Sequence, residues 1–326
     1  MRHAEPDRRM HEHLPTLADV EAARRRISAH ARLTPVLRDE ALDAEIGARL
    51  YFKCENLQRV GAFKFRGACN AVFALDDIRA ARGVVTHSSG NHGAALAAAA
   101  ALRGIPAHVV VPEHANAQKL RNIVDAGATV HRCAPTLAAR EATCAAIVHE
   151  SGACLVHPYT DPMVMAGQGT VALELLDQTN GLDAFIAPLG GGGLMSGCAT
   201  ALRARAPQVT LIGAEPDGAD DARRSLAAGH VVAVDHPKSI CDGLLATIGE
   251  INRIALVTHR VEVLCVDDAA VRVAMRRLWD CLKLIVEPSS AITYAVLHAH
   301  RERFRGQRIG LLLSGGNVDL DAIPAL

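Results

Sequence analysis

Lys64 has the most distinctive chemical setting of any side chain in this sequence. It stands in GAFKFRG at 61–67, between two phenylalanines, and it is one of only five lysines among 35 Lys and Arg residues. A neutral lysine amine can attack a carbonyl carbon or accept a proton, which an arginine cannot do. Burial between aromatic rings lowers the pKa of an amine and so supplies its neutral form. We therefore predict that Lys64 is a nucleophile or a base, with an ordinary surface lysine as the alternative.

Four glycine-rich turns accompany this lysine. They are GAFKFRG itself, SSGNHG at 88–93, GGGG at 190–193 and SGGN at 314–317. In open parallel sheets, turns at the carboxyl ends of strands bind ligands, and their backbone N–H groups suit anions. We predict that Gly190, Gly191, Gly192 and Gly193 cradle a phosphate, with a flexible turn as the alternative. The spacing is neither GxGxxG nor GxxxxGK[ST], which argues against the usual sites for NAD and ATP.

The turn SSGNHG precedes an alanine-rich stretch that predicts a helix. Ser88, Ser89 and the N–H groups after them would then lie at a helix N-terminus, where a substrate carboxylate binds well. Helix capping by Ser89 is the alternative role. Three histidines near the turns are candidate acids or, alternatively, packed side chains: His87, His92 and His157.

The segment EPDGADD at 215–221 places four carboxylates within seven residues, after a predicted strand. Carboxylates together with a backbone carbonyl are the ligands that a hard cation such as Mg²⁺ or Ca²⁺ prefers. The segment therefore predicts a metal site. An acidic start to the next helix is the alternative explanation for Asp220 or Asp221.

Strands alternate with helices along most of the chain. From Gly83 onward, β-branched runs such as VVTH and HVVV are each followed by a helical stretch, a pattern typical of parallel β-α-β units. The segment 229–258 is expected to be a loop. No Pro-, Gly- or Ser-rich linker divides the chain, so we expect interleaved domains: residues 83–159 as the small domain, and residues 1–82 plus 160–326 as the large one.

The composition limits the classes of partner. Lys plus Arg and Asp plus Glu both number 35 in the 326 residues, and this zero net charge argues against a nucleic-acid-binding or membrane-surface protein. No apolar run reaches the length of a membrane span, and the N-terminus lacks the apolar core of a signal peptide. The nine cysteines include no CxxC pair, which favours a reducing compartment. We expect a cytoplasmic protein that binds small molecules.

These motifs, taken in order, resemble a known enzyme family. GAFKFRGACNAV, SSGNHGAAL, APLGGGGLMSG, GAEPDGADD, EPSSA and LLLSGGNVDL are similar to motifs of the fold-type-II pyridoxal-phosphate enzymes, above all the serine racemase and serine/threonine dehydratase family. The resemblance runs from about residue 16 to 320. It implies an α/β fold like that of the tryptophan synthase β chain, with two open parallel-sheet domains and the cofactor between them. It also implies a homodimer.

The resemblance assigns roles to individual residues. Lys64 would bond covalently to pyridoxal phosphate and move the substrate's α-proton on one face, and Ser89 would act on the other face. Further implied cofactor contacts are Phe63, Asn91, Gly190, Gly191, Gly192, Gly193 and Ser314. Implied substrate contacts are Ser88, Ser89, Gly90, Asn91 and His92. Implied ligands of Mg²⁺, with Ca²⁺ or Mn²⁺ as substitutes, are Glu215, the Ala219 carbonyl and Asp221.

Ser314 bears on the reaction type. A neutral hydroxyl cannot hold a full proton on the pyridine nitrogen, which weakens the electron sink and favours prompt loss of a β-leaving group. We therefore expect an ammonia-lyase (dehydratase) of small L-β-hydroxy amino acids, L-serine, L-threonine or 3-hydroxyaspartate, giving a 2-keto acid and ammonia. A serine racemase with side dehydratase activity is the main alternative. A non-catalytic pyridoxal-phosphate-binding protein and a β-replacement enzyme are further alternatives.

Overall fold

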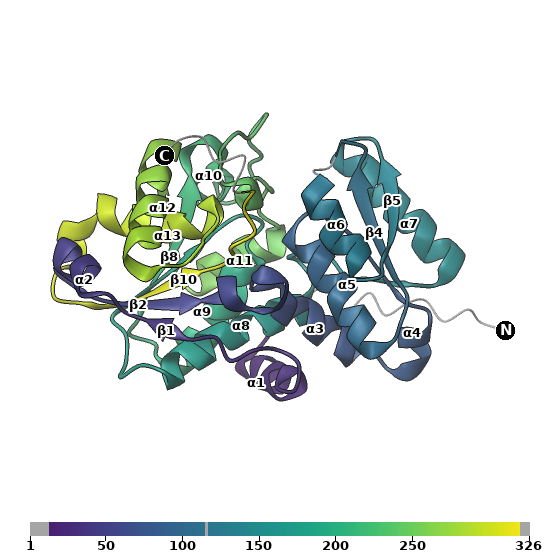
Figure 1. Cartoon of the computed structure of the whole chain (residues 1–326), viewed down its shortest axis with the longest axis horizontal. Coiled ribbons are helices and arrows are strands. Elements are labelled where there is room, and N and C mark those ends of the chain that lie inside the picture. The colour runs from purple at the N-terminus through teal and green to yellow at the C-terminus, as the bar shows by residue number, and fades with distance from the viewer. Residues whose placement is uncertain (1–12, 115–116, 320–326) are drawn as a thin grey trace.

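The computed structural model describes residues 13–114 and 117–319, and it contains two parallel sheets in two lobes (Figure 1). The larger lobe holds a six-stranded sheet, and its order is β1 (Val36–Leu37), β2 (Arg49–Cys54), β10 (Arg308–Leu313), β7 (Ala184–Pro188), β8 (Thr210–Pro216) and β9 (Glu262–Val266). Only the short edge strand β1 runs antiparallel to its neighbour. The expected α/β fold is confirmed.

Helices cover both faces of the large sheet. One face packs on α2 (Glu40–Ile46), α12 (Asp268–Leu282) and α13 (Pro288–Ala299). The other face packs on α8 (Pro162–Asp177) and α9 (Gly193–Arg205), with α1 (Leu17–Ile27) and α11 (Glu250–Thr258) beside them. Because successive strand residues point to opposite faces, Ile186 belongs to the first core and Phe185 to the second. A parallel sheet buried on both faces accounts for the nearly continuous apolar runs of its strands.

The smaller lobe holds a four-stranded, wholly parallel sheet. Its order is β5 (Thr129–Cys133), β4 (Ala107–Pro112), β3 (Val84–His87) and β6 (Cys154–Leu155). Helix α7 (Leu137–Ser151) packs on one face, and α5 (Asn91–Arg103) and α6 (Ala117–Asp125) pack on the other. The short α4 (Asp77–Ala81) precedes β3. This sheet lies within the segment predicted as the small domain, residues 83–159, and the domain boundaries themselves stay a prediction.

Helix α3 (Lys64–Ala74) joins the two lobes (Figure 1). Its apolar face shares one core with β3 and α5 of the small lobe and with residues of α1 and α8. Close packing against α8 depends on small residues, since a Cβ at Gly67 would lie 2.7 Å from the Val164 carbonyl oxygen. Lys64, the first residue of α3, is therefore held at the junction between the lobes.

A buried ion network fixes the start of α3 to the large lobe. Arg66 donates to both Glu55 and Glu174, and Lys53 also donates to Glu174 at 2.7 Å. All four side chains are buried. Burial alone would raise the pKa of Glu174, but Arg66 and Lys53 outweigh it and lower that pKa. Two cations and two anions leave the network neutral, as a buried cluster requires.

One expectation about the elements was wrong. The segment 229–258, expected to be a loop, contains α11, which begins after Gly249. Its buried residues Asn252, Ala255 and Leu256 follow the three-to-four spacing of a helix face. No helix in residues 13–114 and 117–319 is long and apolar enough to cross a membrane.

Candidate active site

A cleft of about 600 Å³ lies between the two sheets. Glycine turns and loops from both lobes line it, as expected for ligand sites at the carboxyl ends of parallel strands. It brings together every residue predicted to contact cofactor or substrate: Phe63, Lys64, Ser88, Ser89, Gly90, Asn91, His92, Gly190, Gly191, Gly192, Gly193 and Ser314.

Lys64 projects into the cleft from the first turn of α3. Its Nζ donates to the Pro158 carbonyl at 2.9 Å and lies 5.3 Å from the centre of the Phe63 ring. Burial lowers the pKa of Lys64 to about 8, in the direction that the sequence predicted. The predicted glycine-rich turn at this residue is instead the start of a helix, and Phe65 packs into the core rather than beside the amine.

The segment before Lys64 is paired with the SGGN turn. Phe63 N donates to the Ser314 carbonyl at 2.9 Å, and Ala62 forms a β-bridge with Gly315. The Ser314 hydroxyl is buried, 3.2 Å from the Ser290 hydroxyl on α13. Two segments about 250 residues apart in sequence are thus held side by side, and Lys64 and Ser314 line one cleft.

The four glycines connect β7 to α9 and have no room for side chains. A Cβ at Gly191 would lie 2.5 Å from the Tyr159 ring, and one at Gly193 would lie 2.7 Å from the Tyr159 carbonyl oxygen. Gly192 has a φ of +94°, which favours glycine. Helix α9 begins at Gly193, and the first N–H groups of a helix have no partner within it. This bare, donor-rich turn fits a phosphate dianion.

Asn252, which was not among the predicted site residues, holds this turn in place. Its Nδ2 donates to the carbonyls of Tyr159 and Gly191, at 3.0 Å for Tyr159. Its Oδ1 accepts from Ser196 of α9 at 3.2 Å. Asn252 lies on α11, in the segment expected to be a loop, and the three-to-four spacing of Asn252, Ala255 and Leu256 is the signal that could have placed it on a buried helix face.

The SSGN turn follows β3 and leads into α5. Gly90, not Ser89, is the N-cap of α5, and it makes no side-chain capping bond. Ser88 Oγ accepts from Gly90 N at 3.3 Å. Helix capping by Ser89, the alternative role considered for this residue, is therefore wrong. His92 is buried against the Val156 carbonyl, and burial, followed by the charge of Lys64, lowers its pKa well below the usual value, so it is neutral.

Asn91 lies between two further polar side chains of the large lobe. Its Nδ2 donates to Glu287 Oε1 at 3.0 Å, and its Oδ1 accepts from Asn317 Nδ2 at 2.9 Å. These two bonds fix which end of the amide is the donor. They also join the first residue of α5 to segments of the large lobe that flank Ser314.

The acidic segment begins in the last two residues of β8, and none of its residues lines the cleft. Both oxygens of Glu215 accept backbone N–H groups, from Ala222 and Arg223, so Glu215 caps α10 (Asp221–Ala228). Asp221 accepts from Ile248 N at 2.7 Å. Burial raises the pKa of Glu215 to about 8 and that of Asp221 to about 6.

The structure does not test the predicted metal site. Over residues 13–114 and 117–319, no three side chains among His, Cys, Asp and Glu form a group that could hold a metal. The predicted ligands Glu215, Ala219 and Asp221 include a backbone carbonyl, so a search for three such side chains does not test them.

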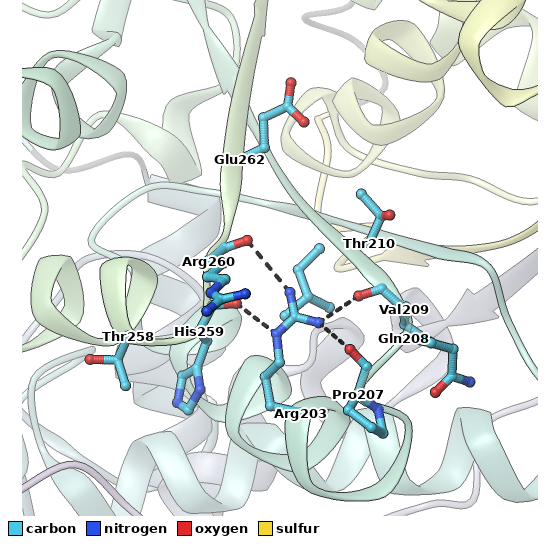
Figure 2. A pocket seen from close by; sticks show the side chains of 10 residues that line it. Arg203, Pro207, Gln208, Val209, Thr210, Thr258, His259, Arg260 and Glu262 are labelled. Atoms are coloured by element: carbon cyan, nitrogen blue, oxygen red, sulfur yellow. Dashed lines mark hydrogen bonds between the residues drawn. The ribbon is translucent and has the colours of Figure 1, made fainter.

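A second hollow of about 550 Å³ lies between α9 and the starts of β8 and β9 (Figure 2). Its central cation, Arg203, donates to the backbone carbonyls of Pro207, Val209 and His259 at 2.7–2.8 Å. These bonds tie the end of α9 to the adjoining loops (Figure 2). None of the predicted site residues lines this hollow, and we assign it a structural role.

Comparison with known proteins shows the family of the chain. Residues 27–315 match the family model described as pyridoxal-phosphate dependent enzyme. The chain is 47% identical to β-hydroxyaspartate dehydratase of Paracoccus denitrificans, over 96% of this chain and 99% of that protein. It is 43% identical to serine racemase of Dictyostelium discoideum, over 95% of this chain and 97% of that one. The structure of maize serine racemase superposes with a TM-score of 0.92 at 41% identity, covering 95% of each chain.

Proposed function

The chain belongs to the pyridoxal-phosphate-dependent enzymes, and we propose that it is an ammonia-lyase of small β-hydroxy amino acids. One observation carries the proposal. The amine of Lys64, with a lowered pKa, shares one cleft with a glycine phosphate cradle and with the SSGN turn. The similarity to β-hydroxyaspartate dehydratase and to L-threo-3-hydroxyaspartate ammonia-lyase of Saccharomyces cerevisiae supports the reaction type.

The residues of the cleft fit the cofactor, and each would contact a different part of it. Gly190–Gly193 would hold the phosphate, Lys64 would bond to the aldehyde carbon, and Ser314 would donate a hydrogen bond to the ring nitrogen. When bound, pyridoxal phosphate draws electrons from the substrate's α-carbon, which makes the α-proton acidic. The Ser314 hydroxyl is a weaker partner for the ring nitrogen than a carboxylate, which favours early loss of the β-hydroxyl over a long-lived carbanion.

Lys64 is the group placed to move the α-proton. Its neutral Nζ would accept that proton and pass it to the β-hydroxyl, so that the hydroxyl leaves as water. The N–H groups of the turn 88–91 hold the α-carboxylate at the start of α5. The enamine product then takes up water and loses ammonia, so the balance is one amino acid giving one 2-keto acid and one ammonia.

Serine racemisation is the second candidate activity, and Ser89 favours it. Ser89 lines the cleft beside Asn91 but does not cap α5, so its hydroxyl is available to a substrate. A second proton carrier on the face opposite Lys64 would let the α-proton return with inverted configuration. The similarity to serine racemases supports this side activity.

We also propose a divalent cation, Mg²⁺, Ca²⁺ or Mn²⁺, at Glu215, the Ala219 carbonyl and Asp221. Glu215 lies near the end of β8, Ala219 lies in the turn that follows and Asp221 is the first residue of α10. Asp221 also bonds to Ile248, next to Thr247 of the cleft. A cation here would neutralise two buried acids and stiffen one wall of the cleft.

We propose further that the two sheets form separate domains at the predicted boundaries and that the enzyme is a homodimer. All nine cysteines are free thiols, which supports a reducing compartment.

A substrate panel tests the lyase. Purified protein with pyridoxal phosphate and Mg²⁺ is given L-serine, D-serine, L-threonine and both 3-hydroxyaspartate diastereomers, and 2-keto acid is measured. We expect release from at least one of them and none from the Lys64→Ala variant. No release from any substrate by cofactor-loaded protein would overturn the lyase. Chiral analysis of the serine samples would then decide between a racemase and a non-catalytic binding protein.

A further inference from the structure

Two histidine rings meet on the small sheet, outside the cleft. His108 lies on β4, and His131 lies on β5, the edge strand of that sheet (Figure 1). Their nitrogens His108 Nδ1 and His131 Nε2 are 3.0 Å apart, and the centres of the two rings are 5.2 Å apart. Neither ring lines the cleft, so the function proposed above does not use this pair.

The pairing of the two strands produces this contact. β4 and β5 are parallel, and His131 lies opposite Val110, two residues beyond His108. Residues two apart point to the same face of a strand, so His108 shares the face of Val110, which packs in the core beneath α7. Cys133 belongs to the same core and places His131 on this face in the same way. The pairing continues over residues 108–112 of β4, so the sheet sets the spacing of the two rings.

The two facing nitrogens share one proton. At 3.0 Å one ring donates a hydrogen bond and the other accepts it with a lone pair. Burial, followed by the charge of His131, lowers the pKa of His108, so this ring is neutral at neutral pH. Among the residues that the structure describes, neither ring forms an ion pair with a carboxylate. Neutral imidazole is the form that binds a transition metal.

The distance between the nitrogens fits two ligands of one metal ion. With the metal–nitrogen length of about 2.0–2.1 Å found in zinc sites, the angle at the ion would be about 95°. Neighbouring ligands of a square-planar or octahedral ion make nearly this angle, whereas a tetrahedral ion would need nitrogens about 3.3 Å apart. Imidazole suits Ni²⁺ and Cu²⁺, and both ions favour tetragonal sites. Mg²⁺ and Ca²⁺ prefer oxygen ligands, so this pair differs in kind from the cation site proposed at Glu215.

We propose that His108 and His131 bind a transition-metal dication with a tetragonal preference, Ni²⁺ or Cu²⁺. The ion takes the place of the shared proton, which moves to the other nitrogen of its own ring, so that the pair loses no proton. The two imidazoles are then neighbouring ligands, and water fills the remaining positions because both rings are partly exposed. Such an ion would tie the edge strand β5 to β4. The inference is independent of the lyase function, because the pair lies outside the cleft.

Calorimetric titration of Ni²⁺ into the cofactor-loaded protein tests the site. The buffer contains excess Mg²⁺, which occupies oxygen sites and leaves imidazoles free. Titrations at neutral pH compare wild type with His108→Gln, His131→Gln and the control His230→Gln. His230 is an exposed histidine of the large lobe, and its Nδ1 lies 3.2 Å from the Ala228 carbonyl.

The two variants of the pair should lose the site, and the control should keep it. We expect His108→Gln and His131→Gln each to bind Ni²⁺ at least about tenfold more weakly than wild type, because each leaves a single imidazole. His230→Gln should match wild type. The circular dichroism of each variant should match that of wild type, which shows that the variant folds. Equal Ni²⁺ affinities in all four proteins, or no Ni²⁺ binding by wild type, would overturn the proposal.

X-ray absorption of wild type with an equimolar amount of Ni²⁺ identifies the ligands without any substitution. We expect scattering from two imidazole rings, with metal–nitrogen distances of about 2.0–2.1 Å. A spectrum without imidazole scattering would overturn the site. So would two imidazole ligands that persist in His108→Gln, because the ion would then be held by other histidines.

Discussion

Uptake of pyridoxal phosphate by the cofactor-free protein should speed up with pH and level off just above pH 8. Covalent capture needs the neutral amine of Lys64, and burial lowers the pKa of that amine from 10.5 to about 8. At pH 7, about one amine in ten is then neutral, against about one in three thousand for a lysine of ordinary pKa. At pH 7 the neutral, reactive form of Lys64 is thus about 300 times more abundant than that of a surface lysine.

Stopped-flow absorbance of the bound cofactor, between pH 7 and 10, measures this directly. A blocked lysine in solution gives the reference profile, which rises until well above pH 10 because its pKa is unshifted. Lys64→Ala should show no slow covalent phase, and reductive trapping with peptide mapping should place the cofactor on Lys64. A rate that follows the solution reference would refute the claim that the cleft supplies a neutral amine.

Three other substitutions separate the remaining roles. Ser89→Ala should spare 2-keto acid release from L-serine but abolish D-serine formation in chiral chromatography, and equal loss of both would contradict a second proton carrier. Gly191→Ala should weaken cofactor retention on dialysis at least tenfold, because its Cβ would lie 2.5 Å from the Tyr159 ring; full retention would show that the glycine turn does not hold the phosphate. We expect Mg²⁺ to raise the Tm of the wild type by a few degrees and Asp221→Asn to abolish that rise; an unchanged rise would place the cation elsewhere.

Local patterns predicted much of the fold and of the cleft. The alternation of β-branched runs and helical stretches predicted the parallel sheets, and the predicted glycine turn at Gly190–Gly193 lies between β7 and α9. Thr16 and Asp19, three residues apart, form a full capping box at the start of α1. These features depend on residues close together in sequence, which is why pattern and spacing reveal them.

The supporting residues of the site depend on contacts between distant segments. Asn252 bonds to Gly191, 61 residues away, and Asn91 bonds to Asn317, 226 residues away. Arg140 is one of many arginines in the sequence, and only the position of α7 at the edge of the small sheet brings it into the cleft. Likewise, capping of α10 by Glu215 crosses the turn after β8, so the acidic segment alone could not show which carboxylate does it.

The central claim is that Lys64 drives elimination from a β-hydroxy amino acid. Its most direct test is the stoichiometry of products when cofactor-loaded wild type and Lys64→Ala are given 3-hydroxyaspartate. We predict that the wild type releases ammonia and the four-carbon 2-keto diacid in a one-to-one ratio, and that Lys64→Ala releases neither. Ammonia without the keto acid, or undiminished release by Lys64→Ala, would contradict the account.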